Sequence, residues 1–480
     1  MPRISQLPTL CGIPFFATLA AVALLPGSAC SGNQLLKLTS PDAQADQLFG
    51  VSVAIDNGTA LIGAYGDSQN GPFVGAAHLF NTATGAPVAK LTPADGQFFD
   101  NFGEAVALAD GYALISSVGS DANGSLSGAA YLYDASSGAQ LGKLLPADGA
   151  ADDRFGRSVA VGEGVALVGA VGDDSGAGSA YLFDLSPLAQ RTKLLPTDGT
   201  AGKEFGTAVA VGGGRAVVGA VGDNAFAGAA YVFDLTTGVQ LAKLVPTDAT
   251  AGSFFGGAVA IEGSLALVGA WKNDANGVDS GAAYLFDLDT GSQLAKLTPA
   301  DGLAGNNFGR SVALEQGVAI IGSPGSGSVA RGAAYLFDTT TLAQLAKLTP
   351  SIAAADNGFG STVGLDGGFA IIGAPGDNQN GAFAGATYLF STAPTIGGDF
   401  NGDRKVDNGD LNLLLGSWGS STVPAAWING FVAPVDNGEL NLLLGDWGFG
   451  VSTAVPEPTA ALLLMTLITL SQLVGNHSPR

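Results

Sequence analysis

The sequence predicts an all-β fold, a seven-bladed β-propeller of four-stranded blades. A unit of 50 to 53 residues recurs seven times along the chain. Each unit contains four short apolar stretches separated by Gly, Asp, Asn and Pro, which is the pattern of four strands joined by turns. A repeat of this length with four strands is typical of a propeller blade. Each copy carries a Phe-Gly pair, whose phenylalanines are Phe49, Phe102, Phe155, Phe205, Phe255, Phe308 and Phe359.

The unit at 142–184 illustrates the expected strands, which lie at 143–145, 158–161, 165–169 and 180–183. Short turns follow the Phe-Gly strand and the Ala-Tyr-Leu-Phe strand, whereas longer loops such as 66–75 and 272–281 follow the Gly-Ala strand. Neighbouring strands in a blade are antiparallel, so alternate connections lie on opposite faces of the ring. We therefore expect the short hairpins on one face, and the longer loops with the links between blades on the other.

The chain enters the repeat out of phase. It begins with a Lys-Leu strand at 36–38 and ends the last repeat at 388–390 with no Lys-Leu strand after it. We expect the N-terminal strand to complete the last blade, because this removes an open sheet edge. The outermost strands carry lysines that we expect to be structural, since charged edges resist aggregation. They are Lys37, Lys90, Lys143, Lys193, Lys243, Lys296 and Lys347.

Acidic residues are frequent in the longer loops, so the face that bears them is expected to be negative. This face is our candidate ligand-binding surface, since clustered charge attracts oppositely charged partners. The alternative is that Asp is there only as a good turn former. The candidate residues are Asp67, Asp121, Asp173, Asp223, Asp274 and Asp377.

Composition excludes several classes of function. The formal net charge is −22, which argues against nucleic acid and anionic membranes as partners, because phosphate binding needs clustered Lys and Arg. The two histidines, His78 and His477, cannot build a Ser-His-Asp triad or a histidine zinc site from different repeats. His78 stands where Tyr131 stands in another repeat, and we interpret it as a strand residue.

Repetition itself argues against catalysis. The loop carboxylates recur from repeat to repeat, which suits avidity or structure better than a single catalytic centre. We therefore predict that the protein is not an enzyme. A carbohydrate-active enzyme that uses a pair of carboxylates is the alternative, because residue types alone do not exclude it.

The first 29 residues are typical of a secretory signal peptide. Arg3 precedes an apolar run at 10–25, and the small residues 27–29 follow it. A retained anchor is the alternative. The only cysteines, Cys11 and Cys30, fall in this N-terminal region, so no disulfide is expected in the propeller.

The Phe-Gly and Gly-Ala-Pro pattern, clearest at 359–360 and 372–377, resembles the FG-GAP repeats of the integrin α-subunit propeller and its short bacterial relatives. The resemblance covers 34–391. It implies an exported, non-catalytic propeller that binds an extracellular protein or glycan on the face with the longer loops. Integrin-type blades often carry a calcium loop between the first two strands. Here that link is a tight turn such as 162–164, so we expect metal-free blades.

Residues 397–450 have a different composition and predict a small helical module. Oxygen-bearing side chains stand at loop positions one, three, five, nine and twelve, the spacing of an EF-hand calcium loop. The module resembles a type I dockerin, which implies one bound calcium ion and a cohesin partner, with the propeller as a spacer in a scaffold. An Asp-Asn-Gly-rich turn without metal is the alternative. The predicted calcium-binding positions are Asp399, Asn401, Asp403, Lys405, Asp407 and Asp410.

The C-terminal segment 455–480 contains Pro456, Glu457 and Pro458, an apolar run at 459–474 and the basic end Arg480. This order is similar to the PEP-CTERM sorting signal, which exosortase-type enzymes process in Gram-negative bacteria with extracellular polymer. The resemblance implies a protein of the cell surface or extracellular matrix that meets the membrane only through this segment. An ordinary membrane anchor is the alternative.

Overall fold

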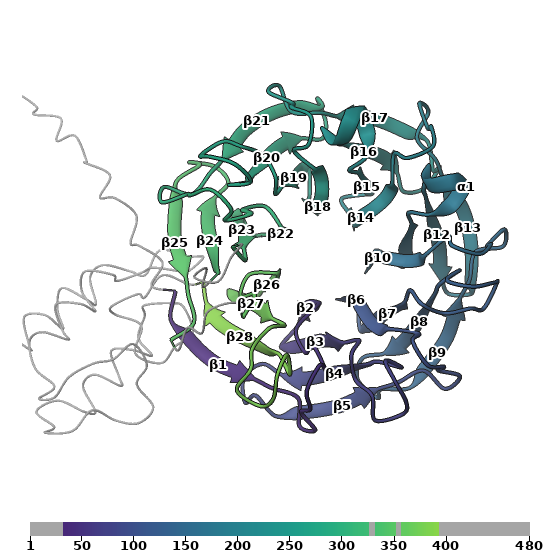
Figure 1. The fold of residues 1–480 in the computed structure, drawn as a ribbon. Helices are drawn as coiled ribbons and strands as arrows, with labels where there is room; N and C mark the ends of the chain where they lie inside the picture. The colour runs from purple at the N-terminus through teal and green to yellow at the C-terminus, as the bar shows by residue number, and fades with distance from the viewer. Residues whose placement is uncertain (1–31, 326–331, 352–356, 393–480) are drawn as a thin grey trace, which may run out of the picture.

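A computed structural model describes residues 32–325, 332–351 and 357–392. These residues confirm the predicted propeller: four-stranded antiparallel sheets form a ring of seven blades around a central opening (Figure 1). The predicted signal peptide, calcium module and sorting segment lie outside the described residues. In the part of the chain that the structure describes, no helix is long and apolar enough to cross a membrane.

Each blade has its Phe-Gly strand innermost and its Lys-Leu strand outermost (Figure 1). The first three blades contain β2 (Val53–Asp56), β3 (Thr59–Ala64), β4 (Ala76–Asn81) and β5 (Pro87–Leu91); β6 (Phe102–Ala109), β7 (Tyr112–Ser117), β8 (Ala129–Asp134) and β9 (Gln140–Leu144); and β10 (Phe155–Gly162), β11 (Val165–Ala170), β12 (Ser179–Leu185) and β13 (Leu188–Leu194).

The next three blades contain β14 (Phe205–Gly212), β15 (Arg215–Ala220), β16 (Ala229–Asp234) and β17 (Gln240–Leu244); β18 (Phe255–Glu262), β19 (Leu265–Ala270), β20 (Ala282–Asp287) and β21 (Ser292–Leu297); and β22 (Ser311–Glu315), β23 (Val318–Ser323), β24 (Ala333–Asp338) and β25 (Gln344–Leu348). The seventh contains β26 (Thr362–Asp366), β27 (Phe369–Ala374), β28 (Ala386–Ser391) and β1 (Gln34–Leu38).

The ring closes through β1, as predicted. This strand pairs antiparallel with β28, and Lys37 stands opposite Tyr388. The last blade is therefore completed by the first strand of the chain, which removes an unpaired edge from β28.

Connections segregate to two faces, as the sequence predicts. On the long-loop face, the links between blades contact the loops after the second strands: the amide of Gly66 donates to the carbonyl of Gln47 at 3.2 Å. Two of these loops contain the one-turn helices α1 (Asp173–Gly176) and α2 (Asp223–Phe226). On the opposite, hairpin face, turns of neighbouring blades meet, and the amide of Gly214 donates to the Glu163 carboxylate at 3.1 Å.

The Phe-Gly and Gly-Ala pairs form the junction between adjacent blades. Gly103 has φ +94°, and a Cβ there would lie 2.3 Å from the carbonyl oxygen of Ala76 in the preceding blade. A Cβ on Gly63 would lie 2.0 Å from the carbonyl oxygen of Gly103. Only glycine permits this approach of two backbones, because real Cβ contacts are never that short. Phe102 is fully buried beside this junction and packs edge-on against Tyr131, with ring centres 5.6 Å apart.

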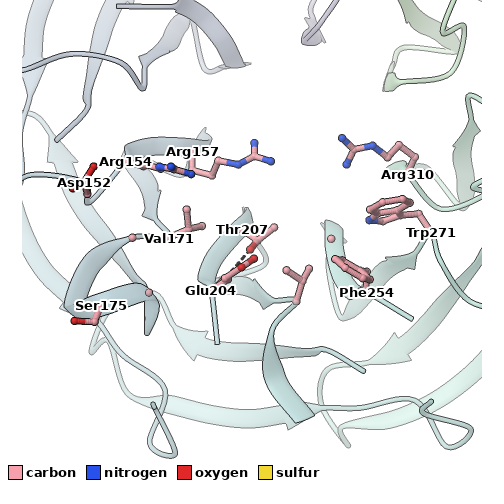
Figure 2. A pocket seen from close by; sticks show the side chains of 14 residues that line it. Asp152, Arg154, Arg157, Val171, Ser175, Glu204, Thr207, Phe254, Trp271 and Arg310 are labelled. Carbon is pink, nitrogen blue, oxygen red and sulfur yellow. Dashed lines mark hydrogen bonds between the residues drawn. The ribbon is translucent and has the colours of Figure 1, made fainter. Parts of the chain in front are cut away.

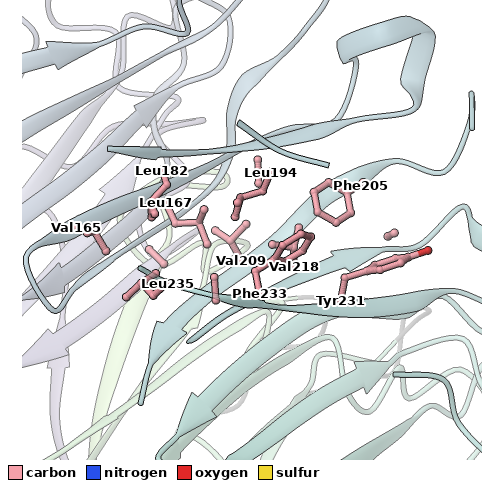
Figure 3. Packing of buried hydrophobic residues seen from close by; sticks show 14 of the residues in the cluster. Val165, Leu167, Leu182, Leu194, Phe205, Val209, Val218, Tyr231, Phe233 and Leu235 are labelled. Atoms are coloured by element: carbon pink, nitrogen blue, oxygen red, sulfur yellow. The ribbon is translucent and has the colours of Figure 1, made fainter. Parts of the chain in front are cut away.

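The hydrophobic core lies between the sheets of adjacent blades. Figure 3 shows one of its clusters, in which Leu167 and Leu182 of one blade pack against Val209, Val218 and Phe233 of the next. Strands buried on both faces explain the continuous apolar runs in the sequence. At the closure of the ring, Leu38 and Leu389 of the last blade pack with residues of the first blade.

Candidate binding site at the ring axis

The six carboxylates predicted to form a ligand-binding face lie on the long-loop face but divide into two groups. Asp67, Asp173, Asp223 and Asp377 are buried, with exposed fractions of 1%, 6%, 7% and 3%. Each pairs with a lysine of an outermost strand. The other two are exposed and accept backbone N–H groups of their own loops: Asp121 from Leu126, and Asp274 from Asp279, both at 2.8 Å.

The outer-strand lysines are structural, as predicted, but their role is ion pairing rather than edge protection alone. All seven lie between 2.5 and 2.9 Å from a carboxylate oxygen of a long loop or an inter-blade link. Six of them also lie 5.0 to 5.4 Å from the centre of a tyrosine ring in the same blade. Much of the negative charge of this face is therefore neutralised within the protein.

The fourth blade shows the geometry of this cluster. Lys243 Nζ is 2.5 Å from Asp223 and 2.7 Å from Asp198, and the Tyr231 hydroxyl oxygen is 2.8 Å from both carboxylates. Burial acts to raise the pKa of Asp223, but hydrogen bonds from Lys243 and Tyr231 outweigh it and lower the pKa. The carboxylate is therefore charged at neutral pH and is already satisfied by its neighbours.

The first blade replaces this tyrosine with His78, which lies in β4 as predicted. A ring nitrogen of His78 and carboxylate oxygens of Asp42 and Asp67 lie within 4.8 Å of one another. However, the Lys90 ammonium is 2.6 Å from Asp42 and 2.8 Å from Asp67, so it already supplies the positive charge that a metal ion would bring. Burial lowers the pKa of His78 to about 4. We therefore assign this cluster a structural role.

A cavity of about 590 Å³ opens at the ring axis on the long-loop face (Figure 2). Inner strands and long loops of neighbouring blades supply its walls. Arg157 and Arg310 extend toward each other across the opening (Figure 2). The remaining charged and aromatic lining residues are Asp152, Arg154, Glu204, Phe254 and Trp271.

Aromatic rings form a continuous strip from the long loops to this cavity. Phe226 stacks on Phe254 with ring centres 5.3 Å apart, and Phe254 contacts Trp271 at 5.2 Å. Phe226 is 42% exposed, and Phe254 and Trp271 are partly exposed. Aromatic residues bury readily, so an accessible strip beside a cavity is typical of a binding site rather than of core packing.

The cations of the cavity differ from those elsewhere in the described residues. Among the described residues, Arg154, Lys272 and Arg310 have no carboxylate within ion-pairing distance, and the nearest carboxylate of Arg157, that of Glu104, is 3.8 Å away. Lys272 and Arg310 instead lie over Trp271, at 4.9 and 5.3 Å from its rings. Burial inside the ring of blades and the positive charge of Arg157 lower the pKa of Arg310.

The other described lysines and arginines each have a carboxylate within 3.0 Å. They are Lys37, Lys90, Lys143, Arg191, Lys193, Lys203, Arg215, Lys243, Lys296 and Lys347. The cations without a close partner are thus gathered at one place.

The channel below this cavity is lined mainly by residues with apolar side chains, and its far end is acidic. Rings of Val, Ala, Leu and Ile from the inner strands line it. At the hairpin face, burial followed by the charges of neighbouring carboxylates raises the pKa of Asp56 and of Glu315. Among the described residues, the cations without a close carboxylate lie at the long-loop mouth, so the cavity on this face is the one suited to an anion. The carboxylates at the hairpin mouth are Asp56, Asp110, Glu163, Glu262, Glu315 and Asp366.

Reasoning from the sequence did not single out Arg157, Arg310 or Trp271. A signal exists in the residue after each Phe-Gly pair, because this position lines the channel and carries six different residue types in the seven repeats. The seven residues are Val51, Glu104, Arg157, Thr207, Gly257, Arg310 and Ser361. Trp271 is the only tryptophan between residues 32 and 392.

Comparison with known families agrees with the fold. The FG-GAP repeat model matches seven consecutive segments, which together span more than half of the chain: 33–80, 86–133, 139–183, 188–233, 239–286, 292–337 and 342–390. A search of curated proteins gave no match. Each matched segment starts on an outermost strand and ends on a third strand, so the sequence repeat is offset by one strand from the structural blade. The chain therefore belongs to the FG-GAP repeat family.

Proposed function

We propose that this chain is an exported, non-catalytic binding protein whose propeller holds a carbohydrate at the axial cavity of the long-loop face. The observation that carries the proposal is the exposed strip of Phe226, Phe254 and Trp271 at the edge of the cavity. The C–H faces of sugar rings stack on accessible aromatic rings, and ligand sites are concave surfaces lined by apolar and aromatic groups with a few polar ones. A protein ligand at the same mouth is the alternative, which the absence of retardation by every polysaccharide would favour.

The arrangement favours binding over catalysis. Four of the six loop carboxylates first considered as a ligand face are buried in ion pairs with lysine, which leaves them unsuited to acid–base chemistry. Within the described residues the single histidine, His78, lies in β4 beside Lys90 and is not among the residues that line the axial cavity. An FG-GAP propeller is compatible with a non-catalytic role.

The sequences of the two terminal segments support an extracellular location for the proposed binding. We propose that residues 1–29 direct export and that Pro456, Glu457 and Pro458 mark a segment processed at the cell surface, where polysaccharide is abundant. We further propose that 397–450 binds one calcium ion and offers an attachment point for a cohesin-type partner.

Affinity electrophoresis of the full chain through gels that contain individual polysaccharides tests the proposal. Trp271→Ala should raise the dissociation constant for a polysaccharide that retards the wild type by at least about tenfold. This change corresponds to a loss of about 1.4 kcal/mol of binding free energy, which we attribute to one stacking contact. Phe99→Ala is the matched control, because Phe99 stacks on Phe73 at 5.9 Å on the same face but is not among the residues that line the axial cavity. No retardation by any polysaccharide, or equal loss in both variants, would contradict the proposal.

A further inference from the structure

We infer that the axial cavity is an anion site, and that the carbohydrate it holds carries acidic groups, uronate carboxylates or sulfate esters, bound between Arg157 and Arg310 beside Trp271. This inference rests on the proposed carbohydrate binding and adds the chemical class of the sugar. Three independent features of the described residues support it: the distribution of unpaired cations, the orientation of two arginines, and the position of the aromatic ring beside them.

The distribution of cations is the first argument. The chain has 41 Asp and Glu residues against 19 Lys and Arg, so carboxylates outnumber the cations that they can pair with. Ten described lysines and arginines have one within 3.0 Å. Arg154, Lys272 and Arg310, which have none, and Arg157, whose contact is long at 3.8 Å, all lie in or beside one cavity. Unsatisfied cations that converge on a concave site indicate a ligand that brings the negative charge.

The orientation of the two arginines is the second argument. Arg157 lies in β10 and Arg310 immediately precedes β22, and their side chains extend toward each other across the mouth of the ring (Figure 2). Two guanidinium groups that face each other repel. Burial is the main cause of the lowered pKa of Arg310, and the charge of Arg157 adds to it. An acid group placed between them would relieve this repulsion, because guanidinium binds carboxylate and sulfate oxygens through paired N–H donors.

The aromatic ring is the third argument. The guanidinium carbon of Arg310 lies 5.3 Å from the centre of the Trp271 ring, and Lys272 Nζ lies 4.9 Å from it. A ring that packs against two cations is held in a defined position. One sugar unit could then place its ring against the aromatic strip and its acid group against the arginines, which a simple inorganic anion could not do.

The carboxylates near the cavity limit the kind of anion. Asp152 and Glu204 line the same cavity as Arg154, Arg157 and Arg310, and Glu104 lies 3.8 Å from Arg157, so any excess of positive charge is small and local. The hairpin mouth of the channel is acidic. The site therefore suits a single acid group on a sugar more than the dense charge of a nucleic acid, whose binding requires many phosphate contacts.

Isothermal titration of the full chain with matched polymers tests the inference. The probes are polygalacturonate, its fully methyl-esterified form and dextran sulfate, each at low and high NaCl. We expect an acidic probe to bind at least tenfold more tightly than the esterified form, and this difference to shrink as salt screens the charges. Tight binding of polygalacturonate identifies a carboxylate ligand, and tight binding of dextran sulfate alone identifies a sulfate ligand.

Variants separate this inference from the proposed function. Arg157→Gln with Arg310→Gln should remove the preference for the acidic probe and leave weak binding of the esterified one. Arg310→Glu alone should do the same. Arg191→Gln with Arg215→Gln is the control, because this pair of changes removes the same two charges at arginines that pair with Asp184 and Asp289. Equal affinity for acidic and esterified polymer would overturn the inference and leave carbohydrate binding intact. No binding of any polymer would overturn both.

Discussion

The hydroxyl oxygen of Tyr231 lies 2.8 Å from the carboxylate of Asp223, a contact between a core strand and a long loop of the same blade. The ammonium of Lys243 covers the same ring at 5.2 Å and pairs with the same carboxylate. Equivalent clusters recur in other blades, for example at Tyr181, Asp173 and Lys193. These contacts fix the long loops to the outer strands and so hold the walls of the axial cavity in place.

Tyr231→Phe should therefore destabilise the propeller. The variant removes a hydroxyl that is buried against two carboxylates, and the loss of one hydrogen bond to a charged group is expected to cost about 1.5–3 kcal/mol. Tyr112→Phe is the control, since its partly exposed hydroxyl has no hydrogen bond in the described part of the chain. Urea denaturation measures both changes. Equal stability of the Tyr231 variant and the wild type would show that the cluster does not stabilise the fold.

The close packing at the junction between blades predicts that alanine destabilises the propeller more at Gly206 than at Gly164, although both glycines have a positive φ. Gly206 has φ +92°, and a Cβ would lie 2.4 Å from the Ser179 carbonyl oxygen of the neighbouring blade. Gly164 has φ +75° and open space around the same position. Gly164→Ala should cost about 1–2 kcal/mol for the strained backbone alone. Gly206→Ala should cost more than that, because two backbones must also separate. Thermal unfolding of the two variants compares them, and equal costs would mean that close approach does not constrain the Phe-Gly pair.

Replacing His78 should change how stability depends on pH. Burial lowers the pKa of His78 to about 4, against 6.5 for the unperturbed side chain. Between these values the unfolded chain binds a proton that the folded chain does not, so stability falls as the pH drops from 7 toward 4. This pKa shift corresponds to a loss of about 3 kcal/mol in the free energy of unfolding once the pH falls to about 4. Asp42 has a pKa of about 2, so it stays charged through most of this range.

His78→Tyr should remove this loss and install the tyrosine that other blades carry. The advantage of the variant over the wild type should therefore be larger at pH 4.5 than at pH 7.5, as measured by urea denaturation at each pH. An advantage that is the same at both pH values would show that His78 does not titrate between them.

Much of the fold could be predicted from the sequence, because the repeat length, the strand pattern and the missing last strand are local properties of the chain. The pairing of the loop carboxylates could not be. Asp67 pairs with Lys90, and Lys90 also pairs with Asp42 of an inter-blade link, a contact that depends on how neighbouring blades pack. Counting acidic residues on one face therefore overestimated its free charge.

The axial site was missed for a related reason. A repeat is recognised by the residues that are the same in every copy. A single site on the ring axis is formed by the residues that differ from copy to copy. Arg157 and Arg310 follow their Phe-Gly pairs at a position where Thr207 and Ser361 stand in other repeats. Only the closed ring brings these positions to one mouth.

Calcium should stabilise the module at 397–450. If Asp399 and the carboxylates after it hold the ion as the loop spacing predicts, calcium should raise the temperature of an unfolding transition of the full chain, and Asp399→Ala should abolish the increase. Asp436→Ala serves as the control, because Asp436 lies in the same module but outside the predicted calcium loop at 399–410. Melting curves that are the same with and without calcium would refute the predicted site.

Trp271 offers the most direct test of binding at the ring axis. It is the only tryptophan between residues 32 and 392, and it lines the axial cavity beside Arg310. Titration of the full chain with an acidic oligosaccharide, followed by tryptophan fluorescence, should give a saturable change that high salt weakens and that Trp271→Phe abolishes. If the oligosaccharide binds and the fluorescence change persists unaltered in Trp271→Phe, the ligand does not occupy the axial cavity and the account is wrong.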